Sequence, residues 1–173
     1  MIFIWSTNEM IGSKIIRWGL SEPCSHFAIG FFETTSMATV LESRLSDGVS
    51  TVTYDSFKER NQIVHLLQAD ISYQDEINLF NWIYEATKGV KYDRKAILFW
   101  VFVGLKMKIL GSELPPRNKF NDDEMLYCVE VLEELEEYLL SIGIDISEID
   151  VSMVSPEMAY KLLKKSDHLR DLI

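Results

Sequence analysis

The sequence is poor in cysteine, proline and positive charge, and each shortage excludes a class of protein. Only two of its 173 residues are cysteines and four are prolines, so neither a disulfide framework nor a proline-rich linker organises the chain. Seventeen Lys and Arg stand against 27 Asp and Glu, a formal charge of −10. That balance argues against nucleic-acid binding and against attachment to anionic lipid, and it favours a neutral or cationic partner.

Long apolar segments are also absent. The most apolar window, residues 96–110, is shorter than the roughly 20 residues needed to cross a bilayer and contains Lys106 and Lys108. It predicts a buried or groove-lining helix, with contact at a membrane interface as the alternative, and no integral membrane segment. Met1 leads directly into an apolar IFIW run without a basic region or a cleavage site, so we recognise no secretory signal and expect a cytoplasmic protein.

Hydrophobic periodicity divides the chain into a β-rich first half and a mostly helical second half. Short β-branched and aromatic runs predict strands at residues 2–5, 25–32, 39–43, 48–54 and 62–68. Helical spacing predicts helices at residues 10–18, 73–88, 96–110, 121–141 and 155–163, with a loop at 111–121. The expected fold is α+β, a small antiparallel sheet of about four or five strands packed against helices in a single domain over residues 1–173.

Residues 121–141 form the predicted helix with the most chemical interest, because Cys128 lies near its start. The unpaired N–H groups and the positive dipole end of a helix N-terminus stabilise a thiolate. Cys128 is therefore a candidate nucleophile, and the alternative is a thiol that simply packs in the core. The many glutamates of this segment are typical of a solvated helix face and oppose a thiolate, so activation depends on the helix N-terminus and a histidine rather than on net charge.

Among the three histidines, His26 has the setting expected of a general base. It follows a turn and precedes an apolar strand, which holds the ring rigidly, although a structural histidine has the same pattern. His65 lies within an alternating strand and His168 in a charged tail, as expected of a structural and a solvated residue. Glu42 lies in an apolar strand, where it either accepts a histidine N–H or faces solvent. Spacing alone does not show whether these residues meet.

The two cysteines allow two further hypotheses. Cys24, His26 and Cys128 could together supply three metal ligands, but the paired spacing of metal motifs is missing, so we expect no metal and no other cofactor. Cys24 also lies two residues from His26, on the same side of the strand, where it is a candidate for a reversible disulfide with Cys128.

Several short motifs occur in an order that points to a known family. They are CSHFAI from residue 24, VLES from residue 40, GVKYD from residue 89, YCVE from residue 127 and SPEM from residue 155. This set resembles the circularly permuted branch of the NlpC-type papain-like superfamily, the YiiX-like bacterial and phage proteins, to which lecithin:retinol acyltransferase is more distantly related. In that branch the histidine strand precedes the cysteine helix, and this chain has the same order.

The resemblance implies roles for individual residues. Cys128 corresponds to the nucleophile, at a helix N-terminus; His26 corresponds to the base, and Glu42 to the residue that orients it. Ser43 competes with Glu42 for that third role. Substrate-binding positions implied by the same motifs are Ser25, Tyr92 and Tyr127, while Tyr92 and Asp93 together match a family position with a structural role or a place at the rim.

The function implied is a cysteine-dependent hydrolase that forms a thioester and acts on peptide or peptidoglycan-type amides. A lipid acyltransferase or hydrolase with the same site is one alternative, and the apolar window at residues 96–110 keeps an acyl-chain or other hydrophobic substrate open. A non-enzymatic binding protein is another, because Val129 replaces a serine that is common after the family's cysteine. If a phage encodes the protein, the expected location is the host cytoplasm or the virion.

Overall fold

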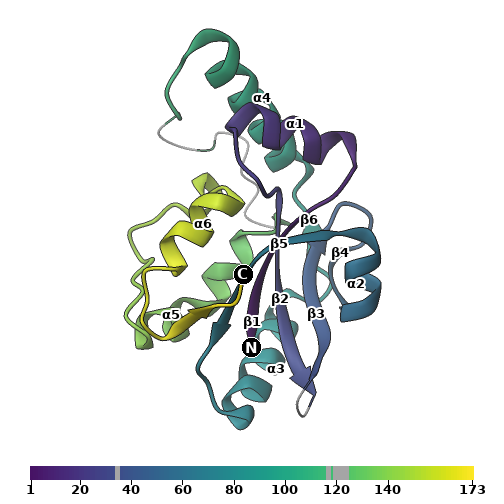
Figure 1. Ribbon diagram of the computed structural model, residues 1–173, viewed down its shortest axis with the longest axis vertical. Coiled ribbons are helices and arrows are strands. Elements are labelled where there is room, and N and C mark those ends of the chain that lie inside the picture. The colour runs from purple at the N-terminus through teal and green to yellow at the C-terminus, as the bar shows by residue number, and fades with distance from the viewer. Residues whose placement is uncertain (34–35, 116–117, 119–124) are drawn as a thin grey trace.

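A six-stranded antiparallel sheet forms the centre of this computed structural model, which describes residues 1–33, 36–115, 118 and 125–173 (Figure 1). The strand order is β4-β3-β2-β1-β5-β8. The strands are β1 (Ile2–Thr7), β2 (His26–Glu33), β3 (Ser36–Arg44), β4 (Gly48–Thr53), β5 (Gln62–Ala69) and β8 (Leu169–Asp171). The α+β class and the antiparallel sheet packed against helices are thus confirmed.

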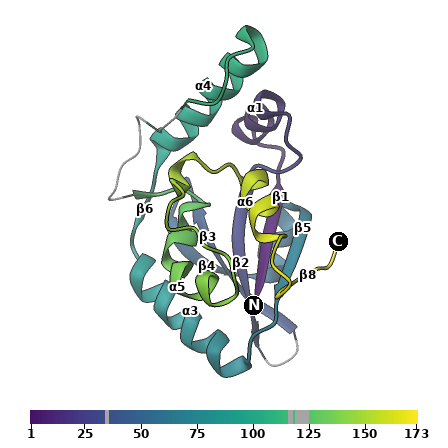
Figure 2. The ribbon, with the colours of Figure 1, turned by 90° about the vertical axis from the view of Figure 1, so that its left-hand side faces the viewer.

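The two faces of the sheet carry separate apolar clusters. Successive side chains of a strand point to opposite faces, so β1 places Phe3 and Trp5 in the larger cluster and Ile2 and Ile4 in the smaller one. Helix α2 (Tyr54–Arg60) covers the smaller cluster with Phe57. The larger one is covered by α3 (Tyr73–Thr87), the 3₁₀ helix η1 (Glu130–Leu135), α5 (Glu136–Ser141) and α6 (Pro156–Leu163) (Figure 2).

The connection between the two central strands, β1 and β2, contains a helix. Ser6 of β1 pairs with His26 of β2, and between them the chain forms α1 (Ile11–Leu20). This helix packs chiefly against α4 (Arg94–Leu110), and the two lie beyond one end of the sheet in both views (Figures 1 and 2). They approach closely at Gly19 and Gly104, where a Cβ on Gly19 would lie 2.6 Å from the Cα of Gly104.

The predicted burial of residues 96–110 is correct for only one side of α4. Ala96, Phe99 and Trp100 are buried, whereas Leu98 and Ile109 are more than two-thirds exposed. A helix that is apolar all round gives no pattern from which to tell the covered side, so the sequence alone did not reveal the exposed one. No helix among the described residues is long and apolar enough to span a membrane.

The single helix predicted at residues 121–141 is wrong, and residues 121–124 lie outside the described part. The chain instead forms β7 (Met125–Leu126), which pairs in parallel with β6 (Lys91–Tyr92), then a turn, η1 and α5. Val129, Leu132 and Leu135 are all buried and stand three residues apart. That period is the period of a 3₁₀ helix, in which side chains at i and i+3 eclipse.

Other differences concern short elements. Residues 55–61, which the sequence leaves as a polar segment between two predicted strands, lie mostly in α2, and Tyr54, predicted to end a strand, begins this helix. Thr53 Oγ1 caps it by accepting a hydrogen bond from Ser56 N at 3.3 Å. The tail forms β8, and residues 151–153 form a second 3₁₀ helix, η2 (Val151–Met153). Helix α6 begins as predicted, with Ser155 accepting from Met158 N and a proline at its first turn.

Candidate active site

Three elements bring the predicted catalytic residues together at the end of the sheet that lies nearest α1. His26 is the first residue of β2, Glu42 lies in β3, and Cys128 lies in the turn between β7 and η1. Glu42 pairs with Ala28, so it lies diagonally across from His26 on the same face of the sheet. The antiparallel register alone therefore places the carboxylate beside the imidazole.

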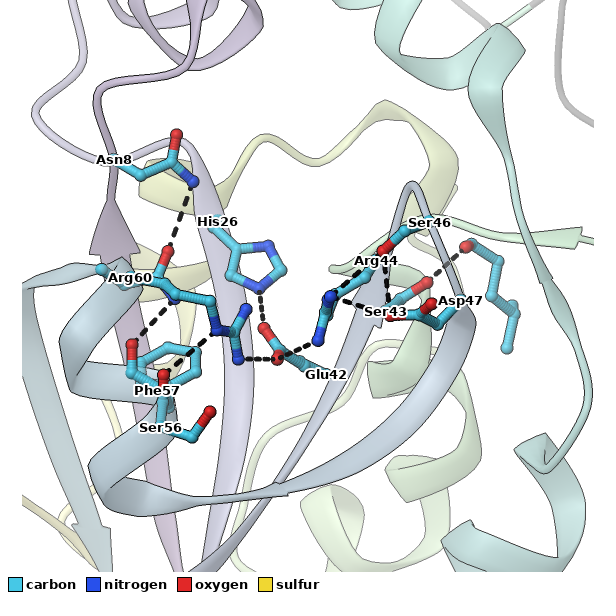
Figure 3. A network of polar contacts seen from close by, with 12 residues as sticks. Asn8, His26, Glu42, Ser43, Arg44, Ser46, Asp47, Ser56, Phe57 and Arg60 are labelled. Atoms are coloured by element: carbon cyan, nitrogen blue, oxygen red, sulfur yellow. Dashed lines mark hydrogen bonds and ion pairs between the residues drawn. The ribbon is translucent and has the colours of Figure 1, made fainter.

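Glu42 binds His26 on one side and arginine on the other (Figure 3). Its Oε2 lies 3.2 Å from His26 Nε2, and its Oε1 accepts a hydrogen bond from Arg60 Nη2 at 2.7 Å. Arg44 Nη1 is 3.8 Å from the same oxygen. Burial favours the neutral acid, but the bonds from His26 and Arg60 outweigh it and lower the pKa of Glu42. The side chain is thus a buried carboxylate.

The sequence left the choice between Glu42 and Ser43 open. Ser43 Oγ donates a hydrogen bond at 2.8 Å to the carbonyl of Leu126, the last residue of β7. It therefore ties β3 to the segment that carries Cys128 and makes its contact away from His26. Glu42 is the residue in contact with the imidazole, and this geometry favours it for the orienting role.

His26 also interacts with Cys128. Burial alone would lower the pKa of His26, but hydrogen bonding to Cys128 and to Glu42 outweighs it and raises that pKa to about 9. Because Nε2 faces Glu42, Nδ1 is the ring nitrogen that remains for another partner. The imidazole thus interacts with Glu42 and with Cys128, the two residues that the sequence proposes as its partners. Cys128 is only 2% exposed.

The residues that flank Cys128 form part of the core. Tyr127 is buried, and its hydroxyl donates to the carbonyl of Val154. Its backbone N–H donates to Glu130 Oε2 at 2.6 Å. Burial raises the pKa of Glu130 to about 8 against the effect of that bond. The substrate-binding role predicted for Tyr127 is therefore not supported, because neither its ring nor its hydroxyl is open to a ligand.

Tyr92 has a different setting, because it lines a cavity of about 580 Å³. Burial raises the pKa of its hydroxyl, and the interaction with Cys128 is the next cause. The lining residues are Leu45, Ser46, Asp47, Gly48, Lys91, Tyr92, Arg94, Lys95 and Met125. This cavity is a candidate substrate pocket, and its lysines and arginine were not predicted as site residues.

Ser25, the other predicted substrate-binding residue, connects α1 to the sheet. Its Oγ lies 2.6 Å from Ser13 Oγ and 3.5 Å from Thr7 Oγ1, and its N–H donates to the carbonyl of Ser6 at 3.0 Å. These bonds fix the backbone immediately before His26. These contacts indicate that Ser25 positions His26. The predicted contact of Ser25 with a substrate stays a prediction.

Arg44 and Arg60 were also not predicted. Arg44 lies two residues from Glu42 in β3. Because side chains alternate between the two faces of a strand, this spacing alone places Arg44 on the same face as Glu42 and could have predicted it. Arg60 lies at the end of α2, and its Nε donates a hydrogen bond to the carbonyl of Ser56 at 3.1 Å. Because α2 was not expected, nothing in the sequence indicated that this residue approaches β3.

A second polar cluster involves the other cysteine. Cys24 Sγ donates to Glu157 Oε2 at 3.5 Å, and His65 Nε2 lies 3.3 Å from the same oxygen. Burial, followed by the charge of Glu157, raises the pKa of Cys24 far above its usual range. His65 stacks on Tyr160 with ring centroids 3.8 Å apart, which agrees with the structural role predicted for it. Both cysteines are free thiols, so the disulfide hypothesised between Cys24 and Cys128 is not formed.

Comparisons with known proteins bear on the fold. No protein-family model matches the sequence, and no curated protein matches it either. The chain is similar to a crystal structure described as metalloprotein yiiX from Escherichia coli O157:H7, DUF1105, with a TM-score of 0.52. The two proteins share a fold. The match covers 99% of this chain and 94% of that chain at 12% sequence identity, so the chain has a YiiX-like fold.

The description of yiiX as a metalloprotein raises the question of a metal in this chain. Within the described ranges, no group of three or more His, Cys, Asp or Glu side chains is arranged to hold a metal ion. Cys24 and His65 both contact Oε2 of Glu157 directly. Their side chains therefore bond to the carboxylate and do not surround a common position that a metal ion would occupy. These residues do not fit a metal centre, and we derive no chemistry from one.

Proposed function

We propose that this protein is a cysteine-dependent hydrolase that cleaves amides through a thioester, with Cys128 as nucleophile, His26 as acid and base, and Glu42 as the orienting carboxylate. The observation that carries the proposal is the position of His26, which bonds Glu42 through Nε2 and interacts with Cys128. Proximity of a thiol, an oriented base and a third polar group is the arrangement required for nucleophilic catalysis by cysteine.

The reaction follows from the charges. With its pKa raised to about 9, His26 carries a proton at neutral pH. An imidazolium next to a cysteine favours the thiolate, which is the reactive form. The thiolate attacks the substrate carbonyl, and the proton on His26 passes to the leaving amine as the thioester forms. Neutral His26 then takes a proton from water, whose oxygen attacks the thioester. The acid is released, and Cys128 and His26 return to their starting state.

Peptide or peptidoglycan-type amides are the first substrate class. A lipid acyltransferase or hydrolase with the same residues is the second, and the exposed apolar side of α4 is the observation that favours it. Incubation with peptide amides and with phospholipid micelles separates the two: release of an amine without any acyl transfer supports the hydrolase, and transfer of an acyl chain supports the lipid enzyme.

Covalent labelling tests the nucleophile. The wild-type protein should react with a thiol-directed acyl probe, and Cys128→Ala should lose the adduct in intact-mass measurements while keeping its circular dichroism. Cys24→Ala is the matched control, because Cys24 is equally buried and its raised pKa disfavours the thiolate, so this variant should label like the wild type. Equal labelling of Cys128→Ala and the wild type would contradict the assignment, and full biological activity of Cys128→Ala would favour a binding protein.

A further inference from the structure

The α1–α4 pair is set apart from the rest of the molecule. Figures 1 and 2 show both helices beyond the end of the sheet, and each packs chiefly on the other. The glycine pair Gly19 and Gly104 lets the two backbones touch. Burial between the helices uses one side of each, and the opposite sides are left without a cover from the sheet or from α3.

Those uncovered sides are apolar. Ile11, Ile109 and Leu110 are each at least 68% exposed, and the other exposed apolar residues of the pair are Trp18, Leu98, Phe102 and Leu105. Single exposed apolar residues are ordinary, whereas a group of seven on two adjacent helices is not. Groups of this kind mark protein or membrane contact sites.

The charge of the pair is opposite to that of the protein. Neither helix contains an Asp or Glu, while together they contain Lys14, Arg17, Arg94, Lys95, Lys106 and Lys108. The other eleven Lys and Arg stand against all 27 Asp and Glu, so the rest of the chain has a formal charge of −16. Of these six cations, Lys14 pairs with Glu9, which flanks α1. The net charge of −10 is therefore unevenly distributed: the α1–α4 pair is cationic and apolar, and the rest of the protein is acidic.

We propose that the α1–α4 pair docks this protein on an anionic membrane surface, with its apolar side chains in the interface and its lysines at the level of the lipid phosphates. Interfacial helices combine an apolar side with Lys and Arg and lie in the headgroup region without spanning the bilayer. Lys106 and Lys108 lie within four residues of Ile109 and Leu110, so their long stems reach the phosphates while the apolar side chains insert.

Electrostatics favours this occupant over a second copy of the chain. Two copies joined through these helices would bring six cations against six, whereas an anionic lipid surface complements them. The strongly acidic remainder of the chain is repelled by the same lipid, which orients the molecule with only this end on the membrane.

The docked orientation also places the candidate active site. Arg94 and Lys95, at the start of α4, line the candidate substrate pocket together with Tyr92. The cavity thus lies at the base of the helix pair, on the membrane side of the sheet. Docking is independent of the proposed hydrolysis, because none of the residues that carry it takes part in the thiol chemistry.

Vesicle sedimentation tests the proposal. The assay uses Cys128→Ala, so that turnover of lipid does not alter the vesicles. Vesicle binding by this variant does not depend on the reactivity of Cys128, so its outcome is independent of the proposed hydrolase activity. We expect it to sediment with vesicles that contain about one third phosphatidylglycerol and to stay in solution with pure phosphatidylcholine, with binding weakened by salt. Failure to bind anionic vesicles overturns the proposal.

Two double variants locate the surface. Lys106→Gln with Lys108→Gln should weaken partition about 30-fold, at about fivefold per charge. Ile109→Ser with Leu110→Ser should weaken it about tenfold or more, because two apolar side chains no longer insert. Partition unchanged in both variants overturns the assignment.

Matched controls come from the far side of the molecule. Leu140→Ser alters a residue that is 58% exposed on α5, and Lys165→Gln removes an exposed charge beyond α6. Both should partition like the parent protein. Sedimentation velocity tests whether a second copy of the chain binds this surface instead. If the parent protein does not bind vesicles but forms a dimer, and the Ile109/Leu110 double variant is a monomer, a second copy covers the surface and the membrane proposal is wrong.

Discussion

Replacing Glu42 by glutamine should move the titration of His26. The difference between the pKa of about 9 and the ordinary histidine value of about 6.5 corresponds to about 3 kcal/mol. Cys128 and Glu42 together supply this difference and also offset the cost of burial, so removal of the carboxylate should remove at least half of it and bring the pKa of His26 below about 8. Arg60 and Arg44 would then face His26 without their anion, which acts in the same direction.

Long-range ¹H–¹⁵N correlation spectra of the imidazoles measure this directly, with His26→Gln to assign the signal. Asp171→Asn is a suitable control, because it removes a carboxylate from β8, whose ion pair is with Lys164. His26 should titrate as in the wild type in that variant. Titration of His26 near 9 in Glu42→Gln would show that the carboxylate does not stabilise the imidazolium and would refute the reasoning.

The same charge has a consequence for stability. A histidine whose pKa is raised by folding binds a proton more tightly in the folded state, so its contribution is complete below about pH 6.5 and is lost as the pH rises through about 9. The free energy of unfolding of the wild type, measured with urea across that window, should fall more steeply with pH than that of Glu42→Gln. Parallel profiles would contradict it.

Three other substitutions test the framework around the site. Arg60→Gln should weaken the hold on Glu42 and lower kcat with little change in KM, shifting the acid limb of the pH–rate profile upward; a change in KM alone would contradict a positioning role. Gly104→Ala should cost about 1–3 kcal/mol in urea unfolding, because its Cβ would lie 2.9 Å from the α1 backbone. Gly48→Ala should cost at least as much, since φ is +73° and its Cβ would meet a carbonyl oxygen at 2.2 Å. Gly12→Ala, with open space, is the control for both glycines, and equal stability of all three variants would refute the packing argument.

The sheet was largely predictable because its strands have clear patterns. The central strand β1 is a run of six buried residues, and β5 ends within one residue of its predicted limit. Helix α2 was missed because Phe57 is its only buried residue, and one residue defines no period. In η1 the three-residue spacing was present in the sequence, but with glutamates between the apolar residues it resembled an amphipathic α-helix.

The site was predictable in its members but not in its contacts. The order of His26, Glu42 and Cys128 suggested a pair and a partner, while their meeting depends on the β2–β3 register and on the β6–β7 pairing that carries the cysteine. Arg60 reaches Glu42 only through the packing of α2 on β3, which no local pattern encodes. The charge of the whole chain likewise gave no information on where its cations lie.

The pairing of Ser6 with His26 gives α1 an unusual independence. The chain leaves the sheet and returns to it at neighbouring positions, so α1 and its flanks are an insertion within a β-hairpin whose ends are already held together. A short turn joining β1 to β2 would preserve the register that sets His26, since closing a shorter loop costs less entropy. The length and character of this insertion therefore do not determine the register of the strands on either side of it.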